Sequence, residues 1–405
     1  MKNILLCGLK YDKNFGDPII NECCKSIIED ILASNNVTEY TVDEIDLRGR
    51  SNFNTFEYLN KNIIFYIKKI IFKVISKINN TLLKDKSSKI YNFLDMVKWY
   101  FTEEYTILHK NYKNKIEAAD SIIFVGGGII KYKYQDFYHY INCVSKIANN
   151  KNIPICLNAV GIEGYDEKNI KCRMLKKALN RKCVKMITTR DDIEKLNKYI
   201  VCKDIITKKV SDPAVYTNRT YNIEKNKNSE IIGLGVCRSN LFIDNDINYD
   251  EENLLNLWKN IIDTLDRNKI KWKIYTNGLE DDNKFAIKLI NKLKLDEHNL
   301  VIPNSPEELV KIVSNFKAII ATRLHSCIVA YSLNIPAVGL VWNRKLKMFG
   351  ESIGYEERFI EVENFNDKFI VEILKKALEE EYNKISQEEY IKGEKDALKD
   401  FLNLY

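Results

Sequence analysis

Short apolar runs alternate along this chain with longer segments in which apolar residues recur at helical spacing. The clearest example lies in residues 315–342, where the apolar run Ala318–Thr322 precedes a helical pattern at Ser326–Leu333 and a second apolar run at Ala337–Val341. Short apolar runs of this kind are typical of strands that are buried in a parallel sheet. We therefore predict a strand, a helix and a second strand here.

The same alternation occurs in both halves of the chain and predicts an α/β protein. In the first half it predicts strands at Asn3–Leu9, Thr41–Leu47, Ser121–Val125, Ile153–Val160, Lys185–Thr189 and Asp204–Thr207. In the second half it predicts strands at Ile231–Val236, Lys271–Tyr275, Leu300–Ile302, Ala318–Thr322, Ala337–Val341 and Phe359–Val362. We expect two Rossmann-like domains that face each other across a cleft. The expected parts are an N-terminal domain at 1–215, a polar linker at 216–230, a C-terminal domain at 231–365 and C-terminal helices at 366–405.

Charged side chains follow two of the predicted strands directly. Arg323, Leu324 and His325 follow one strand of the second half, and Arg238 follows another. Open parallel sheets bind ligands at the carboxyl ends of their strands, where helix N-termini favour anions. Arginine supplies a fixed planar charge there, and histidine can transfer a proton near neutral pH. An isolated Arg-Leu-His sequence also fits a surface ion pair followed by a helix-start residue.

Three glycines, Gly126-Gly127-Gly128, follow the predicted strand at Ser121–Val125. Such a triplet lets the backbone approach a ligand and leaves N–H groups free to donate, although a tight strand-to-helix turn also needs glycine. The next residues, 131–140, alternate aromatic and basic side chains. This segment predicts either a surface on which a sugar ring stacks or an amphipathic helix that packs its aromatic residues inward.

The composition, with 45% hydrophobic and 29% charged residues in a chain of 405, is typical of a soluble globular protein. The ten cysteines include no C-x-x-C spacing, so we expect reduced thiols and a cytoplasmic protein. The first residues lack a signal-peptide pattern, and no apolar run is long enough to span a membrane. The net charge of +7 suits small anions or a membrane surface and does not indicate nucleic acid.

No metal site is predicted. The four histidines, His109, His139, His298 and His325, are widely separated along the chain. Asp244-Asn245-Asp246 has the D-x-D spacing that some glycosyltransferases use for a metal ion. It lies in a polar segment, however, where Asp and Asn are typical of turns and caps.

Residues 62–78 predict an amphipathic helix. Apolar residues fall at positions 63, 64, 67, 70, 71, 74, 75 and 78, while Lys69, Lys73 and Lys77 form a separate stripe. A basic helix of this kind can lie in an anionic membrane interface, which would place the protein peripherally on the inner face of the membrane. The alternative is a helix that packs on the sheet and turns its lysines to solvent.

The ordered set of motifs resembles the polysaccharide pyruvyl transferase family. The motifs are Asn14-Phe15-Gly16-Asp17, Gly126-Gly127-Gly128, Arg190-Asp191, Ser211-Asp212-Pro213-Ala214, a strand that ends in Arg238, and Thr322-Arg323-Leu324-His325. The resemblance extends from Asn3 to Trp342 and implies a GT-B-like fold. It also implies transfer of a pyruvyl group from phosphoenolpyruvate to two hydroxyls of a sugar, with formation of a cyclic ketal.

The resemblance further implies roles for individual residues. Arg323, Leu324 and His325 would lie at the phosphoenolpyruvate, with His325 as the catalytic residue. An upstream arginine would also bind the donor, and Arg238 matches it better than Arg190. We assign the acceptor side of the cleft to Asn14, Asp17, Gly126, Gly127 and Gly128. The expected acceptor is a cell-surface glycan precursor or a lipid-linked oligosaccharide, and no metal or other cofactor is expected.

Two alternatives remain open at this point. The first is a GT-B-type glycosyltransferase that uses a nucleotide sugar, and the second is a non-catalytic glycan-binding protein of the same fold. Arg238, Arg323 and His325 supply more positive charge than a neutral sugar needs. A donor with a carboxylate and a phosphate needs arginine forks, and ketal formation needs a group that alternates between acid and base. These residue types therefore favour the pyruvyl transferase.

Overall fold

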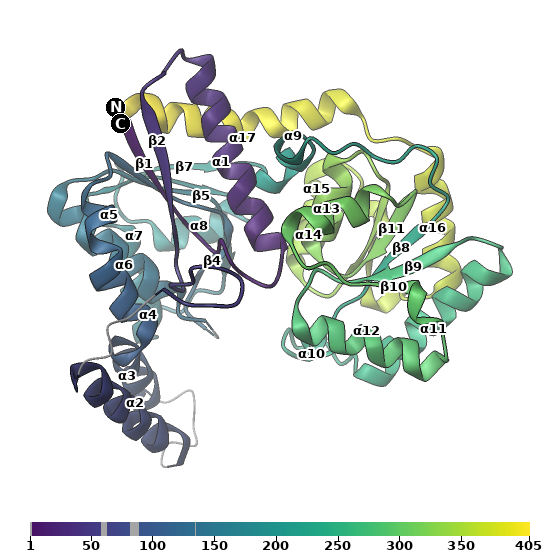
Figure 1. The fold of residues 1–405 in the computed structure, drawn as a ribbon, viewed down its shortest axis with the longest axis horizontal. Coiled ribbons are helices and arrows are strands. Elements are labelled where there is room, and N and C mark those ends of the chain that lie inside the picture. Colours follow the sequence, from purple (N-terminus) through teal and green to yellow (C-terminus); the bar gives the residue numbers. More distant parts are fainter. Residues whose placement is uncertain (1, 58–62, 82–88, 134) are drawn as a thin grey trace. The chain divides into compact units, whose positions relative to one another are not determined.

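The computed structural model describes residues 2–57, 63–81, 89–133 and 135–405 (Figure 1). Its contacts divide the chain into two compact units. The first unit contains Met1–Tyr11, Ile27–Ser211 and Glu394–Tyr405, and the second contains Asp12–Ser26 and Asp212–Gly393. Two helices, α1 (Gly16–Ser34) and α17 (Lys384–Leu404), therefore belong partly to each unit. The segment that we expected to be a linker, 216–230, contains a short helix of the second unit.

The first unit is built on a parallel sheet that has seven strands among the described residues. The strands are β1 (Lys2–Gly8), β2 (Tyr40–Asp46), β3 (Ser121–Phe124), β4 (Gly127–Lys131), β5 (Ile155–Glu163), β6 (Val184–Thr189) and β7 (Ile206–Lys209). Their order is β2-β1-β3-β5-β6-β7, and β4 pairs with β5. The apolar runs of β1, β3 and β5 are buried, as expected of strands that are covered on both faces.

Helices of the first unit complete its core. Besides parts of α1 and α17, they are α2 (Ile63–Thr81), α3 (Lys89–Lys98), α4 (Glu103–Thr106), α5 (Lys113–Glu117), α6 (Phe137–Lys151), α7 (Ile170–Leu179) and α8 (Ile193–Tyr199). Single turns are η1 (Trp99–Phe101) and η2 (Ile107–Asn111). The helix predicted at 62–78 is present as α2, although Asn62 lies outside the described residues.

The second unit is built on a second parallel sheet, with six described strands. They are β8 (Ile232–Gly235), β9 (Trp272–Tyr275), β10 (Leu300–Val301), β11 (Ala318–Ala321), β12 (Ala337–Val341) and β13 (Phe359–Glu361). The order β10-β9-β8-β11-β12-β13 corresponds to 3-2-1-4-5-6, which is the strand order of the Rossmann fold. The chain therefore reverses its direction of winding between β8 and β11, and ligands of such sheets bind at the carboxyl ends of the strands at this point.

The helices of the second unit follow its strands in alternation. They are α9 (Thr217–Tyr221), α10 (Asn240–Ile243), α11 (Glu251–Arg267), α12 (Glu280–Leu293), α13 (Pro306–Ser314), α14 (Leu324–Ser332), α15 (Arg344–Ile353) and α16 (Asp367–Glu379), with single turns at η3 (Pro213–Tyr216), η4 (Glu297–Asn299), η5 (Glu356–Arg358) and η6 (Val362–Asn364). Ser305 caps α13, because its side chain accepts a hydrogen bond from the backbone N–H of Glu308 at 3.1 Å.

The predicted α/β architecture with two Rossmann-like parallel sheets is confirmed. Two alternatives that the sequence left open are decided by the structure. The glycines at 126–128 do not form a strand-to-helix turn, because Gly127 and Gly128 begin β4. Phe137 and Tyr138 are buried in the first turn of α6, so the amphipathic helix that packs its aromatic residues inward is confirmed. The sequence pattern did not predict α15.

Two observations concern cysteines and membrane spans. All ten cysteines are free thiols, and nine of them are buried. Among the described residues, no helix has both the length and the low charge that a membrane crossing needs.

Candidate active site

The ends of β8 and β11 meet at the reversal point of the second sheet. The backbone N–H and the hydroxyl of Thr322, directly after β11, both donate to the carbonyl of Gly235 at the end of β8, at 3.0 and 2.9 Å. A side chain at Gly235 would collide with Ala321 and the Tyr275 hydroxyl, so glycine is needed for the strands to pack this closely. These contacts bring Arg238 and Arg323 to the same edge of the sheet.

Arg323 is held by a buried carboxylate. Its Nε and Nη2 atoms donate to the two oxygens of Asp282 at 2.8 and 2.6 Å, which is a bidentate pair. Asp282 is fully buried in the first turn of α12, and only 12% of the Arg323 side chain is exposed. Burial lowers the pKa of Arg323, but the charge and hydrogen bonds of Asp282 outweigh this effect and raise it overall. Arg323 is therefore a permanently charged group in a fixed orientation.

Arg238 lies beside this pair and is more accessible. Its backbone N–H donates to Asp282 at 3.0 Å, so one carboxylate holds the residues that follow β8 and β11. Its guanidinium forms ion pairs with Asp281 at 3.2 Å and with Asp244 at 3.7 Å, and the side chain is 34% exposed. Arg323 and Arg238, two of the three predicted donor-binding arginines, thus each have an acidic partner that the sequence did not reveal.

His325 lies in the first turn of α14 and is almost fully buried. Its Nε2 atom is 3.9 Å from an Asp212 carboxylate oxygen. Asp212 is buried too, and its other oxygen accepts the backbone N–H of Ala214 at 2.9 Å, which fixes the carboxylate at the start of η3. A side chain at Gly16 would overlap the imidazole, with its Cβ 2.2 Å from Nδ1. The absence of a side chain at Gly16 therefore makes room for the histidine ring.

The Asn14–Asp17 motif belongs to this same site, because residues 12–26 are part of the second unit. The Phe15 N–H donates to the carbonyl of Asn277 at 3.0 Å, and the Asn14 amide donates to the Asp17 carboxylate at 3.1 Å. The charge of Asp17 also acts on Arg323. The Asn277 side chain in turn accepts a hydrogen bond from the hydroxyl of Ser326, the residue after His325, at 2.7 Å.

The remaining predicted site residues belong to the first unit. Gly127 adopts the positive φ of 90°, and the ideal Cβ of Gly161 on β5 would lie 3.1 Å from the Cα of Gly128. Gly127 therefore has a backbone conformation that favours glycine, and Gly128 lies where β4 and β5 pack closely together. Arg190 directly follows β6. The structure describes these residues in a separate unit from Arg238, Arg323 and His325.

The D-x-D segment behaves as a turn. Asp246 has a left-handed backbone with φ of 62°, and Asp244 pairs with Arg238. Within the described residues, no group of three or more His, Cys, Asp or Glu side chains is arranged to hold a metal ion.

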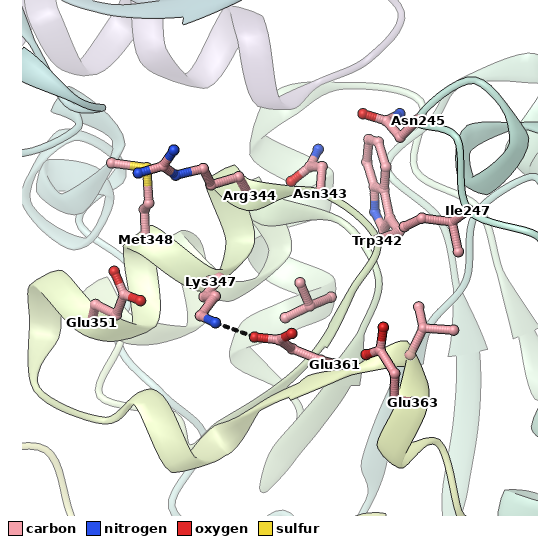
Figure 2. A pocket seen from close by; sticks show the side chains of 12 residues that line it. Asn245, Ile247, Trp342, Asn343, Arg344, Lys347, Met348, Glu351, Glu361 and Glu363 are labelled. Atoms are coloured by element: carbon pink, nitrogen blue, oxygen red, sulfur yellow. Dashed lines mark hydrogen bonds and ion pairs between the residues drawn. The ribbon is translucent and has the colours of Figure 1, made fainter. Parts of the chain in front are cut away.

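A cavity of about 570 Å³ opens next to the site, at the carboxyl ends of β12 and β13 (Figure 2). Figure 2 shows Arg344 and Met348 on one side of the cavity and Trp342 and Asn245 on the other. The indole N–H of Trp342 donates to the carbonyl of Thr322 at 2.5 Å, so the cavity wall is tied to the residue before Arg323. Lys347 also lines the cavity and pairs with Glu361.

A model of the family described as polysaccharide pyruvyl transferase matches residues 14–344. The chain belongs to this family. The match begins at Asn14 and ends at Arg344, so it includes every predicted site residue and part of the cavity wall. No curated protein matches the chain.

Solved structures that are similar to this transferase family member have the GT-B fold. One is the UDP-GlcNAc 2-epimerase of Methanocaldococcus jannaschii, with 14% identity, a TM-score of 0.57 and complete coverage of both chains. Another is the UDP-GlcNAc 2-epimerase of Neisseria meningitidis bound to UDP-GlcNAc, with 12% identity, a TM-score of 0.53 and complete coverage of both chains. At these identities the likeness concerns the fold.

The sequence did not reveal the acidic residues that pair with the arginines and the histidine of this site. Asp282 stands in an acidic stretch, Glu280-Asp281-Asp282, which is the usual composition of a helix N-terminus. Asp212 was part of a recognised motif, but no role was assigned to it. Arg344 and Lys347 were missed with α15, although Leu346, Phe349 and Ile353 follow the helical spacing that would have predicted it.

Proposed function

We propose that the protein transfers a pyruvyl group from phosphoenolpyruvate to two hydroxyls of a glycan or of a lipid-linked sugar precursor. The observation that carries this proposal is the placement of Arg323 and His325 in one strand-to-helix turn, beside Arg238, at the reversal point of a Rossmann sheet. Family membership supports the reaction class. A nucleotide-sugar donor is the competing proposal, because the similar structures include enzymes named for UDP-GlcNAc.

The proposed reaction begins with a proton that is transferred to the methylene carbon of phosphoenolpyruvate, which becomes a methyl group. The neighbouring carbon becomes electrophilic, and a first sugar hydroxyl attacks it. The bond to phosphate breaks, and a second hydroxyl attacks the same carbon to close the ketal. Of the two hydroxyl protons, one replaces the proton that entered the methyl group and the other leaves with inorganic phosphate. No oxidant or reductant is required.

His325 is suited to move these protons, because an imidazole can act as an acid in the first step and as a base in the later ones. Asp212 is the positioning residue in this proposal. Its carboxylate lies 3.9 Å from Nε2 and is itself fixed by a hydrogen bond from the Ala214 N–H, so it can orient the ring. General acid–base catalysis of this kind contributes about 10²–10⁴-fold in rate.

The two arginines have different roles in the proposed donor site. Among the described residues, the third nitrogen of Arg323, Nη1, has no hydrogen-bond partner, so Arg323 can offer it to the donor while Asp282 keeps the group in place. Arg238 would exchange its exposed partners Asp281 and Asp244 for the donor's carboxylate or phosphate. Such exposed ion pairs contribute only about 0–1 kcal/mol, so their loss is small. The proposed charge balance uses arginines and invokes no metal ion.

The acceptor side of the proposal rests on Asn14 and Asp17. Their polar groups lie in the same unit as His325 and Arg323, and Asp17 acts on Arg323 through its charge. A carboxylate and an amide are suitable partners for sugar hydroxyls. We propose that the acceptor is a precursor of a cell-surface glycan and that the reaction takes place in the cytoplasm.

Ligand-induced thermal stabilisation tests the donor. In EDTA, phosphoenolpyruvate at 100 times its Kd should stabilise the protein by about 2.7 kcal/mol, whereas UDP, GDP and inorganic phosphate should not. The Arg238→Gln variant should lose this shift. The matched control is Arg267→Gln, which changes an exposed arginine of α11 and should keep it.

The other outcomes of this experiment also decide the question. A shift with UDP or GDP and none with phosphoenolpyruvate would overturn the proposal in favour of a nucleotide-sugar enzyme. The absence of a shift with any of these ligands would favour the non-catalytic alternative. Equal shifts with phosphoenolpyruvate and phosphate would show a general anion site.

A further inference from the structure

The helices α2 and α3 contact each other, and they contact the rest of the first unit at η1 and α7 (Figure 1). The inner side of α2 is already occupied. Phe65 and Phe72 line a pocket of about 200 Å³ together with residues of η1 and α4, and Asn79 is buried. Lys98 of α3 lies over the ring of Phe72 at 5.5 Å. Phe65 and Phe72 therefore face the rest of the first unit on this inner side.

The outer side of α2 carries an unusual aliphatic stripe, which consists of Ile63, Ile67, Ile70 and Val74. These side chains are 50–77% exposed. Their spacing of four, three and four residues places them on one line along the helix. The alternative in which this apolar face packs on the sheet is therefore wrong for these four residues. Neighbouring α3 adds two more exposed apolar side chains, Ile90 and Phe93.

A row of lysines runs beside the aliphatic stripe. Lys69, Lys73 and Lys77 recur every four residues, are exposed, and form no ion pair with a described carboxylate. At about 100° per residue, Lys77 and Lys73 lie next to the stripe, while Lys69 lies farther round the helix and also borders the pocket on the inner side. The whole of α2 contains no acidic residue. This face therefore combines exposed aliphatic groups with uncompensated positive charge.

A protein partner would need both an apolar groove and a row of acidic groups in matching register. An anionic lipid bilayer supplies both properties without any register, because its headgroups are negative and its acyl region begins a few ångströms below them. Contiguous exposed apolar side chains on a helix, flanked by lysines, are the composition of helices that lie in such an interface. Charge complementarity thus selects the occupant.

We propose that the outer face of α2, together with Ile90 and Phe93 of α3, docks the protein on an anionic bilayer. The aliphatic stripe enters the boundary between headgroups and acyl chains, and Lys69, Lys73 and Lys77 contact the lipid phosphates. Docking of this kind would bring the enzyme to acceptors that are carried on lipids. The docking itself does not depend on which donor the enzyme uses, so it can fail or succeed independently of the proposed reaction.

Vesicle co-sedimentation of the full chain tests the proposal. The protein should pellet with vesicles that contain phosphatidylglycerol and phosphatidylcholine, and should remain in the supernatant with phosphatidylcholine alone. Replacing the lysine row by Lys69→Gln, Lys73→Gln and Lys77→Gln should weaken binding at least tenfold and reduce its dependence on salt. The matched control replaces three exposed lysines elsewhere in the first unit, Lys151, Lys182 and Lys203, by Gln and should bind normally.

The aliphatic stripe needs its own variant. The triple change Ile67→Ser, Ile70→Ser and Val74→Ser should weaken vesicle binding at least tenfold, whereas Val201→Ser, Ile287→Ser and Ile385→Ser, at comparably exposed positions outside α2 and α3, should not. All six positions are exposed, so the melting temperatures should stay close to that of the parent protein.

Three results would overturn the proposal. The first is equal recovery in the supernatant with and without anionic vesicles. The second is vesicle binding that the control substitutions weaken as much as the α2 substitutions do. The third is a lipid-free dimer that the aliphatic variant converts to a monomer in sedimentation velocity while vesicle binding is unchanged, which would identify the face as a contact between two copies of the chain.

Discussion

The adjacent residues Asp281 and Asp282 provide a matched comparison of an exposed and a buried ion pair. Both stand in the first turn of α12, and each pairs with one arginine of the candidate site. The Asp282–Arg323 pair is bidentate and buried, while Asp281 is 52% exposed beside Arg238. Because both carboxylates lie near the same helix N-terminus, their interactions with the helix dipole are similar and largely cancel in a comparison.

Asp282→Asn should destabilise the protein by about 3–5 kcal/mol, because it leaves the Arg323 guanidinium buried without a counter-charge. It also weakens the hydrogen bond that holds the Arg238 backbone. Asp281→Asn removes only an exposed contact and should cost at most about 1 kcal/mol. Urea denaturation, followed by a probe in the second unit, measures both changes through the midpoint at constant slope.

A double-mutant cycle sharpens this prediction. Arg323→Gln alone leaves Asp282 buried and unpaired, so it should also be strongly destabilising. The double variant removes both charges, and its loss should therefore be much smaller than the sum of the two single losses. If Asp282→Asn and Asp281→Asn had equal effects, or if the double variant were additive, the pair would not be the contact that fixes Arg323.

Two further predictions concern His325 and Glu394. His325→Ala should lower kcat for acceptor-dependent phosphate release by about 10²-fold or more while donor affinity stays within a few-fold. Asp212→Asn should lower kcat less, because it leaves the imidazole in place and removes only the carboxylate that orients it. Near-normal turnover of His325→Ala would contradict the assigned role. Burial raises the pKa of Glu394 from 4.5 to about 8 against the effect of its hydrogen bond from Asn158. Between these two pH values the folded state keeps the Glu394 proton, whereas the unfolded state loses it. The contribution of neutral Glu394 to the free energy of unfolding is therefore complete below about pH 4.5 and falls by about 1.4 kcal/mol per pH unit as the pH rises to 8. Glu394→Gln should remove that slope in denaturation measured from pH 5 to 8, and parallel curves for the two proteins would contradict the assignment.

The strands and their terminal residues could be predicted because burial in a parallel sheet leaves a strong local signal. The run before Arg323 is apolar at every position, since β11 is covered on both faces. A charged residue directly after such a run must stand at the edge of the sheet, so Arg323 and Arg238 could be placed before any tertiary contact was known. The exception was β4, whose glycines have no pattern that distinguishes a short strand from a turn.

The partners of those residues could not be predicted, because they depend on contacts between segments that are far apart in the chain. Three consecutive acids begin α12, and only the tertiary fold determines that Asp282 is buried against Arg323 while its neighbour faces solvent. The same holds for Asp212, which precedes His325 by more than a hundred residues and lies beside its ring. Local patterns carry information on burial, but not on which buried carboxylate meets which cation.

The most consequential contact of this kind involves the segment after β1. Sequence order places Asn14–Asp17 in the first half, yet the backbone of Phe15 is bonded to Asn277, and Gly16 packs against His325. A side chain at Gly16 would displace the imidazole, so the identity of a residue near the N-terminus constrains the position of the proposed proton-transfer group. Asn14 and Asp17, which we assigned to the acceptor side, therefore lie in the same unit as Arg323 and His325, which we assigned to the donor and to catalysis. In the proposed reaction, Asn14 and Asp17 would hold the sugar hydroxyl that attacks a donor bound by Arg323.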